Sequence, residues 1–156
     1  MPVIVISRKT LQHFFKELRE AIGPKVDGVL YRCGVEGGQA FVGTIVEWTG
    51  SKDPVEIVDE LGDIYSRCGW FAVDSIQMDP VTRQARIRLK RSLETHGIEG
   101  RFDKPVCSFL SGYFAGFFRS LFWSDTIECE ELACRGKGDE VCEFVLRDSK
   151  PLEPRA

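Results

Sequence analysis

The repeat of apolar side chains predicts an amphipathic helix near the N-terminus. Apolar residues recur at helical spacing over residues 11–22, which is typical of a helix with one buried face. Ser7 or Thr10 can cap its first turn, and Gly23 with the proline that follows ends it. The preceding run, residues 3–6, is apolar and short, which favours an edge strand.

Residues 26–48 carry two apolar stripes at helical spacing, with glycines between them. Gly34, Gly37 and Gly38 interrupt the pattern, and each glycine inside a helix costs about 1 kcal/mol relative to alanine. We therefore expect a kink or loop between two helices in this region. Cys33 belongs to the first apolar stripe, and we expect it in the core.

The next segment combines a capped helix with a β-hairpin. Asp53 is followed by a proline, the pattern of an N-cap and a first helical residue, so a helix is expected from there to Gly69. Residues 70–77 are rich in strand-forming side chains. A turn at Asp79 then leads to residues 85–90, where apolar and basic side chains alternate. We interpret the basic face of this strand as solvated rather than as a phosphate-binding stripe.

The C-terminal third contains the most apolar stretch of the chain. Residues 105–123 are apolar nearly all round, which predicts a central, buried helix. Gly112 and Gly116 lie on one face of it, where another helix or strand can approach closely. The length of the stretch and Arg119 argue against a membrane span, which needs about 20 apolar residues. Two strands joined by a glycine-rich turn complete the pattern.

These elements predict one domain of α+β (mixed α/β) class over residues 1–148, with N-terminal helices, an antiparallel sheet of hairpins and a buried helix. Residues 149–156 form a polar tail or the start of a linker. The net charge of -3 indicates neither direct nucleic-acid binding nor attraction to an anionic membrane. The apolar run at the N-terminus is too short for a signal peptide, so we expect a cytoplasmic protein with reduced cysteines.

Three cysteines and a glutamate are spaced so that one metal ion could gather them. Cys107 opens the predicted buried helix, Cys134 ends the first strand of the last hairpin, and Cys142 lies on the second. Glu131 precedes Cys134 by three positions. Thiolate and carboxylate ligands suit a closed zinc site. Free cysteines are also common as small buried hydrophobic residues, so the residues alone leave both interpretations open.

Cys129 is a rival ligand, because it shares strand parity with Glu131. Cys134 breaks that parity, so a β-bulge or a strand end near residues 132–133 is needed if Glu131 and Cys134 are to face one site. Three thiolates, a carboxylate and Zn²⁺ would carry a formal charge of about -2, which backbone N–H groups of the 136–138 turn and the basic residues beside them could offset.

The run P-V-C-S-F-L-S-G-Y-F-A-G, followed by E-x-x-C and G-D-E-V-C-E-F, resembles the C-terminal half of 4-vinyl reductase (4VR) domains. The match is specific over residues 85–147 and looser before them. This family includes the sensor domains of phenol- and xylene-responsive transcription regulators, a protein tied to bacteriochlorophyll vinyl reduction, and stand-alone archaeal and bacterial proteins. Residues 92–94 (Ser-Leu-Glu) are similar to a Ser-aromatic-Glu segment of these domains, with Leu93 in place of the aromatic residue.

The resemblance implies a ligand-binding fold shared with vesicle-tethering complex subunits and similar to haem-based nitric-oxide sensors. It also implies a structural zinc ion (Zn²⁺) with four protein ligands, which are Cys107, Glu131, Cys134 and Cys142. Four protein ligands leave no open position for a reacting water molecule, so the zinc would not be catalytic.

The many aromatic side chains indicate either a filled core or an apolar pocket, and the resemblance favours the pocket. The candidate residues for binding a small hydrophobic, aromatic molecule are Trp48, Trp70, His96, Phe109, Tyr113 and Phe117. The favoured function is therefore a zinc-stabilised sensor or carrier domain.

Two other functions stay open. The family name suggests an enzyme or accessory protein of tetrapyrrole vinyl reduction, but the sequence shows no nucleophile–base pair, phosphate loop or dinucleotide motif, so no catalytic residue is assigned. An interaction module without a small ligand is the other alternative, by analogy with the tethering subunits, and that analogy predicts a homodimer through the N-terminal helices. The same cysteines could also sense redox conditions.

Overall fold

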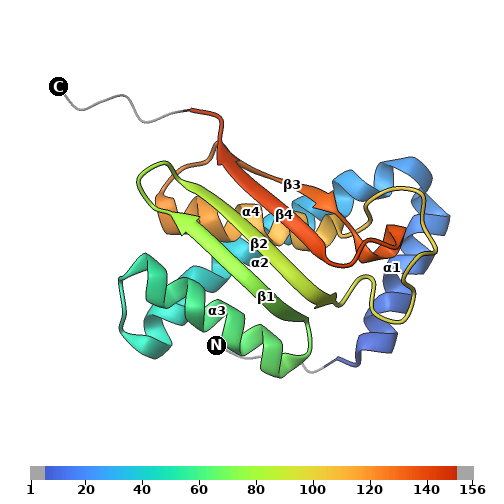
Figure 1. Cartoon of the computed structure of the whole chain (residues 1–156), viewed down its shortest axis with the longest axis horizontal. Coiled ribbons are helices and arrows are strands. Elements are labelled where there is room, and N and C mark those ends of the chain that lie inside the picture. The colour runs from blue at the N-terminus through green and yellow to red at the C-terminus, as the bar shows by residue number, and fades with distance from the viewer. Residues whose placement is uncertain (1–5, 151–156) are drawn as a thin grey trace.

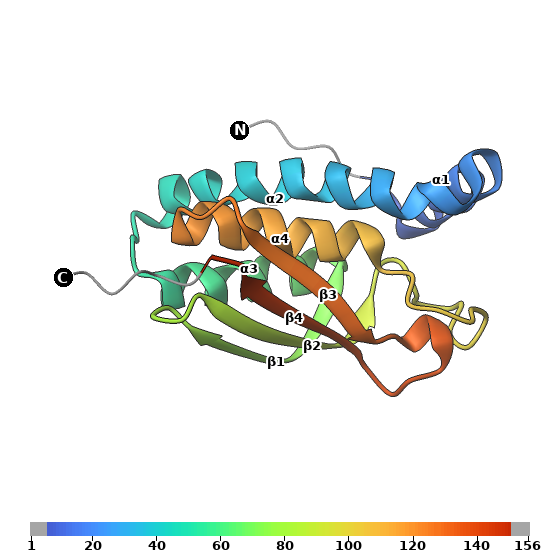
Figure 2. The same cartoon turned by 90° about the horizontal axis from the view of Figure 1, so that it is seen from above.

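A four-stranded antiparallel sheet and one buried helix form the centre of the molecule. The computed structural model describes residues 6–150. In chain order its elements are α1 (Arg8–Ile22), η1 (Gly23–Lys25), α2 (Val26–Thr49), α3 (Pro54–Cys68), β1 (Phe71–Asp79), β2 (Gln84–Ser92), α4 (Ser108–Phe122), β3 (Ile127–Ala133), η2 (Arg135–Lys137) and β4 (Cys142–Asp148). The strand order is β1-β2-β4-β3. Helix α4 covers one face of the sheet, α2 lies on the far side of α4, and α3 runs beside β1 (Figures 1 and 2). The predicted mixed helix-and-sheet class is confirmed.

The polar residues expected to start two helices do so. The Ser7 hydroxyl accepts a hydrogen bond from the Thr10 N–H at 3.1 Å, and the Asp53 carboxylate accepts one from the Val55 N–H at 2.8 Å. These bonds satisfy backbone donors that have no partner inside the first turn of a helix. The edge strand expected over residues 3–6 falls, apart from its last residue, outside the described residues.

Helix α2 is continuous over 24 residues, so the kink or loop expected at its glycines was a wrong prediction. A Cβ atom at Gly34 would lie 2.1 Å from the carbonyl oxygen of Phe109, and one at Gly38 would lie 2.0 Å from that of Tyr113. Glycine is needed because the backbones of α2 and α4 touch at these points. The packing of the two helices offsets the low helix propensity of glycine.

The contact is reciprocal, because α4 also presents glycines to α2. A Cβ at Gly112 would lie 1.9 Å from the Tyr31 carbonyl oxygen, and one at Gly116 would lie 2.0 Å from that of Val35. The close approach expected at these two glycines is therefore confirmed, with α2 as the partner. Cys33 is exposed, which corrects its expected place in the core: it lies about 100° round the helix from its neighbour at the contact face.

Strands β2 and β4 place alternate side chains beneath α4. The buried residues of the two strands on this face are Ala85, Ile87, Leu89, Cys142, Phe144 and Leu146. On the opposite face, the Arg88 guanidinium lies 3.6 Å from the Glu143 carboxylate, and the Lys90 ammonium lies 3.4 Å from that of Asp74. Acidic side chains of neighbouring strands thus compensate the basic stripe of β2, in agreement with its interpretation as a solvated face.

Helix α4 is central, as its composition predicted. Every residue from Leu110 to Phe118 is buried. Within residues 6–150, no helix combines the length and the apolar character that crossing a bilayer requires.

Candidate functional site

Four side chains from separate parts of the chain meet at one end of the sheet. Cys107 is the N-cap of α4, Glu131 lies near the end of β3, Cys134 follows that strand, and Cys142 begins β4. One ligand atom of each lies within 4.8 Å of those of the other three. Three thiols and a carboxylate at this separation could hold a metal ion. They are the four residues selected from the sequence, and we call them the metal cluster.

A bulge in β3 makes this convergence possible. The pairing of β3 with β4 shifts register between Glu131 and Ala133, where the parity of the sequence required it. The shift lets Glu131 and Cys134 face the same point. Cys129 lies outside the cluster found among the described residues, and its N–H donates a hydrogen bond to the Tyr31 hydroxyl at 3.3 Å.

Backbone N–H groups contact the cluster at two points. The Sγ atoms of Cys107 and Cys142 are 3.8 Å apart, and the Arg135 N–H donates to the Cys142 sulfur at 3.4 Å. Glu131 accepts a hydrogen bond from the Cys107 N–H at 2.9 Å through Oε2. Its Oε1 is buried and has no hydrogen-bond partner among residues 6–150. A buried carboxylate oxygen without a partner is costly, and a cation bound between the four side chains would satisfy it.

Burial changes the protonation of these groups. It raises the pKa of the Cys107 thiol well above its ordinary value. It also raises the pKa of Glu131 to about 9, and the neighbouring Cys134 adds to this effect. Contacts with the sulfurs of Cys107 and Cys142 instead lower the pKa of Cys134 far below its usual range. Without a cation, burial therefore opposes the ionisation of all four groups at once. A divalent cation favours the ionised form of every ligand, so its binding would release protons.

Residues 92–95 support the cluster from the end of β2. The Ser92 hydroxyl lies 3.3 Å from the Cys107 sulfur, and that of Thr95 lies 3.8 Å from the Cys142 sulfur. Both side chains are fully buried. In the sequence, residues 92–94 were notable only for their resemblance to a family segment. In the structure, the hydroxyls at the two ends of residues 92–95 each contact one of the sulfurs.

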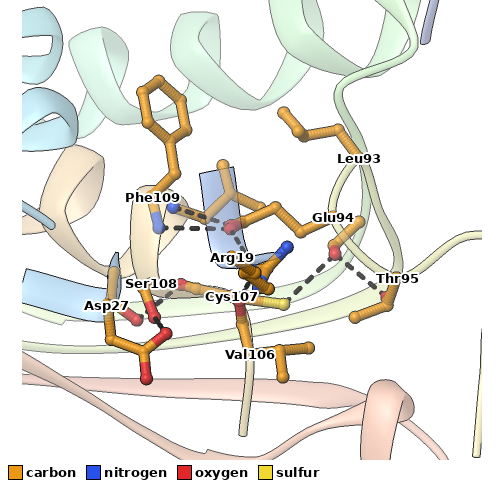
Figure 3. A network of polar contacts seen from close by, with 12 residues as sticks. Arg19, Asp27, Leu93, Glu94, Thr95, Val106, Cys107, Ser108 and Phe109 are labelled. Atoms are coloured by element: carbon orange, nitrogen blue, oxygen red, sulfur yellow. Dashed lines mark hydrogen bonds and ion pairs between the residues drawn. The ribbon is translucent and has the colours of Figure 1, made fainter. Parts of the chain in front are cut away.

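Glu94 fixes the first turn of α4 (Figure 3). Its buried carboxylate accepts hydrogen bonds from the N–H groups of Phe109 at 3.2 Å and Leu110 at 2.9 Å. Burial raises the pKa of Glu94 to about 8, although these bonds and Arg19 oppose the shift. The Arg19 guanidinium lies 3.7 Å from this carboxylate and donates to the Val106 carbonyl oxygen at 2.8 Å. Sequence reasoning missed this role, because a capping residue normally lies next to its helix and Glu94 is separated from α4 by a loop.

Three of the six candidate ligand residues lie together at the edge of the core, with Tyr113 buried and the other two half-buried. The ring centroids of Trp70, Phe109 and Tyr113 are 5.6 to 6.2 Å apart. Tyr65 and Phe41 complete this group, which we call the aromatic cluster. The hydroxyl groups of Tyr65 and Tyr113 form a buried hydrogen bond with each other. Sequence reasoning had placed Tyr65 only on the buried face of its helix.

The other three candidates lie around or away from the aromatic cluster. Trp48 is half exposed, and its ring lies against that of Phe41, with ring centroids 6.1 Å apart. Phe117 is buried and packs against Phe118. His96 lies in the loop after β2, where its Nδ1 is 3.9 Å from the Glu99 carboxylate.

The C-terminal part of the chain matches a known family of domains. Residues 86–148 match the model of the 4-vinyl reductase domain family, abbreviated V-4-R. The matched region contains all four residues of the metal cluster, together with Ser92, Glu94 and Thr95. The resemblance to 4-vinyl reductase domains seen in the sequence is thereby confirmed for this part of the chain.

A curated relative extends the similarity to nearly the whole chain. Over 151 residues the chain is 24% identical to the transcriptional regulatory protein XylR of Pseudomonas putida. The alignment covers 92% of this chain and 26% of XylR. The chain therefore spans about a quarter of that regulator.

Solved structures share the fold. The phenol-responsive sensory domain of the transcription activator PoxR, solved with phenol, aligns with a TM-score of 0.79 and 18% identity, covering 95% of this chain and 77% of that one. Subunit 3 of the trafficking protein particle complex of Naegleria fowleri, covalently bound to palmitic acid, aligns with a TM-score of 0.61 and 12% identity. This alignment covers 94% of this chain and 98% of the subunit. The expected likeness to tethering subunits is confirmed. The alignment with an H-NOX domain is looser, with a TM-score of 0.49.

Proposed function

We propose that this chain is a zinc-stabilised domain that binds a small hydrophobic, aromatic molecule and acts as a sensor or carrier. The observation that carries the proposal is a pair of buried tyrosine hydroxyls inside the aromatic cluster. The fold shared with the PoxR sensory domain, a structure that contains phenol, supports the same class of ligand.

The Tyr65–Tyr113 pair offers a polar anchor in an apolar setting. In such a pair one hydroxyl donates and the other accepts, so the pair leaves the proton of the accepting hydroxyl free for an additional oxygen. The surrounding rings supply apolar surface for a second aromatic group. A phenol or aromatic alcohol would place its hydroxyl at the tyrosine pair and its ring against Trp70 and Phe109, two half-buried side chains at the border of the cluster. Binding would replace part of the contact between these rings.

Calorimetric titration with phenol tests this site. We expect phenol to bind, and we expect Tyr113→Phe to weaken its binding about tenfold through loss of one hydrogen bond in an apolar setting. Tyr31→Phe is the matched control, because the Tyr31 hydroxyl bonds to the Cys129 N–H outside the aromatic cluster. Fatty acids and a vinyl porphyrin should bind more weakly than phenol. Binding of phenol that is the same in both variants and wild type would place the ligand elsewhere, and absence of binding at millimolar phenol would refute the proposed function.

Zinc at the metal cluster is supported by the donor set and its spacing. Two sulfurs at about 2.3 Å from one zinc ion, at a tetrahedral angle, are about 3.8 Å apart, and the Cys107 and Cys142 sulfurs have this separation of 3.8 Å. The unpartnered oxygen of Glu131 supplies a fourth ligand. Such an ion would connect the start of α4 to both strands of the last hairpin. Because thiolate ligands must stay reduced, a cytoplasmic location fits this proposal.

A homodimer through the N-terminal helices also belongs to the proposal. Helix α1 exposes two large apolar side chains, Phe14 at 54% and Ile22 at 38% of their surface, and a second copy of the chain could cover them. Sedimentation of the purified chain at micromolar concentration should give the mass of a dimer. A monomer under these conditions would contradict this part of the proposal.

A further inference from the structure

A cleft separates helix α1 from the loop that follows β2, and none of the residues lining it belongs to the aromatic cluster. It encloses about 510 Å³, a volume typical of small-molecule sites. Gln12 holds α1 to one side of it by donating to the carbonyl oxygens of Leu93 and His96 at 2.9 and 2.8 Å. Arg19 holds the other side through Val106. The two anchors are about 10 Å apart along the helix. Helix α1 is therefore fixed by hydrogen bonds on both sides of the cleft.

The cleft has two aromatic walls with a guanidinium group between them. Phe15 comes from α1, and Phe102 comes from the loop, where its N–H donates to the Gly136 carbonyl oxygen at 3.0 Å. The central carbon of the Arg19 guanidinium lies 6.0 Å from the centroid of each ring. Ile98 adds a further apolar side chain. Phe15 is almost fully buried, so a flat apolar group can lie against Phe102 and Ile98 while its polar group reaches the arginine.

The cationic groups of the cleft are only partly neutralised. Lys16, Arg19 and Arg101 line it, together with Glu20 and Glu94. Glu20 is 3.4 Å from Lys16 in an exposed pair, which screening by water and salt makes weak.

Arg19 itself has hydrogen-bonding capacity to spare. Both oxygens of Glu94 already accept backbone hydrogen bonds from the start of α4, and this carboxylate is 3.7 Å from Arg19. The Nε of Arg19 is buried without a hydrogen-bond partner among the described residues, although 19% of the side chain remains exposed. A guanidinium presents its donors in a fork that matches a carboxylate.

We infer that this cleft binds an aromatic carboxylate, with its carboxylate group at Arg19 and Arg101 and its ring against Phe102 and Ile98. Lys16, at the rim, adds long-range attraction for the anion. This site differs from the one proposed for phenol in both residues and charge, and it shares no side chain with the aromatic cluster. The two regions meet at Phe109, where Phe15 packs on its ring with centroids 5.7 Å apart and Glu94 accepts a hydrogen bond from its N–H at 3.2 Å.

Calorimetric titration of the full chain with 2-naphthoate, 2-naphthalenemethanol and decanoate tests the inference. The acid and the alcohol have the same ring system and differ in charge, whereas decanoate keeps the charge and lacks the rings. We expect naphthoate to bind about tenfold or more tightly than either of the other two, because each lacks one part of the recognition.

Variants locate the binding. The double variant Lys16→Gln/Arg101→Gln changes two exposed side chains and should weaken naphthoate binding about tenfold. Arg67→Gln, an exposed arginine on α3, is the control and should bind like wild type. Tyr113→Phe should also leave naphthoate binding unchanged, which separates this site from the phenol site. Equal affinities for the acid and the alcohol, or an unchanged affinity in the double variant, would overturn the inference.

Discussion

Replacing Gly38 with alanine is expected to destabilise the domain by forcing α2 away from α4. The added Cβ would lie 2.0 Å from the Tyr113 carbonyl oxygen and 2.7 Å from the Phe117 backbone nitrogen. Both are backbone atoms of a buried helix, so no side chain can turn aside to make room. A carbon–oxygen contact needs about 3.3 Å. The two helices must therefore separate by about 1 Å at the point where their backbones touch.

The size of the effect follows from two opposing contributions. Overfilling a packed core costs about 1 to 3 kcal/mol, and a rigid backbone contact belongs at the upper end of that range. Alanine regains about 1 kcal/mol through its better helix propensity. The net expectation is a loss of about 2 kcal/mol in the free energy of unfolding.

Urea unfolding followed by circular dichroism measures this loss, and the same helix provides its control. At Gly43 an added Cβ would meet no described atom within 4 Å, so Gly43→Ala should gain up to about 1 kcal/mol from helix propensity alone. We expect the two variants to shift the urea midpoint in opposite directions. If Gly38→Ala were as stable as Gly43→Ala, the glycines of α2 would not be there for close packing.

Three further predictions concern charge, metal and assembly. Hydrogen bonds to Asp148 from Thr126 and its other neighbours outweigh its burial and hold its pKa at about 2. Its carboxylate therefore stabilises the fold fully above about pH 4 and loses this effect as the pH falls towards 2. The free energies of unfolding of wild type and Asp148→Asn should differ by about 2 kcal/mol at pH 7 and by less at pH 3. A difference independent of pH would be evidence against this role. Glu131→Gln should lose zinc to a chelator at least about tenfold faster than wild type, whereas Glu128→Gln, exposed on the same strand, should not; equal rates would exclude Glu131 as a ligand. Phe14→Glu should shift the sedimentation equilibrium towards monomer by placing charge on the apolar side of α1, and an unchanged mass would move the dimer contact elsewhere.

Local patterns in the sequence predicted the alternating strands and the Asp53 cap, and they narrowed the first cap to Ser7 or Thr10 and the break in β3 to a bulge or a strand end. Ser7 and Asp53 act within one turn of their own positions, and the parity of Glu131 and Cys134 is a property of a single strand. The continuity of α2 was not accessible in this way, because the reason for Gly34 and Gly38 lies in the carbonyl groups of another helix about 75 positions later. Helix propensity alone predicted a break at these glycines, whereas in the folded protein they allow the two helix backbones to touch.

In the candidate site, too, the roles that depend on distant parts of the chain could not be predicted from the sequence. Residue chemistry and spacing made a metal site one of two open interpretations, and the family resemblance selected the four residues that meet in the structure, with Glu131 in place of Cys129. Glu94 and Arg19 were not assigned roles, since each acts on the start of α4 across a large separation in sequence. Tyr65 was placed in the core without a role, and only the structure brings its hydroxyl to that of Tyr113.

The proposal on which the others most depend is that one zinc ion holds the start of α4 to the last hairpin. Zinc-edge X-ray absorption combined with elemental analysis, on native chain purified without chelators, tests it. We expect one zinc per chain, with three sulfur neighbours at about 2.3 Å and one oxygen at about 2.0 Å. A chain without stoichiometric zinc, or a spectrum without sulfur among the nearest neighbours of the ion, would contradict it.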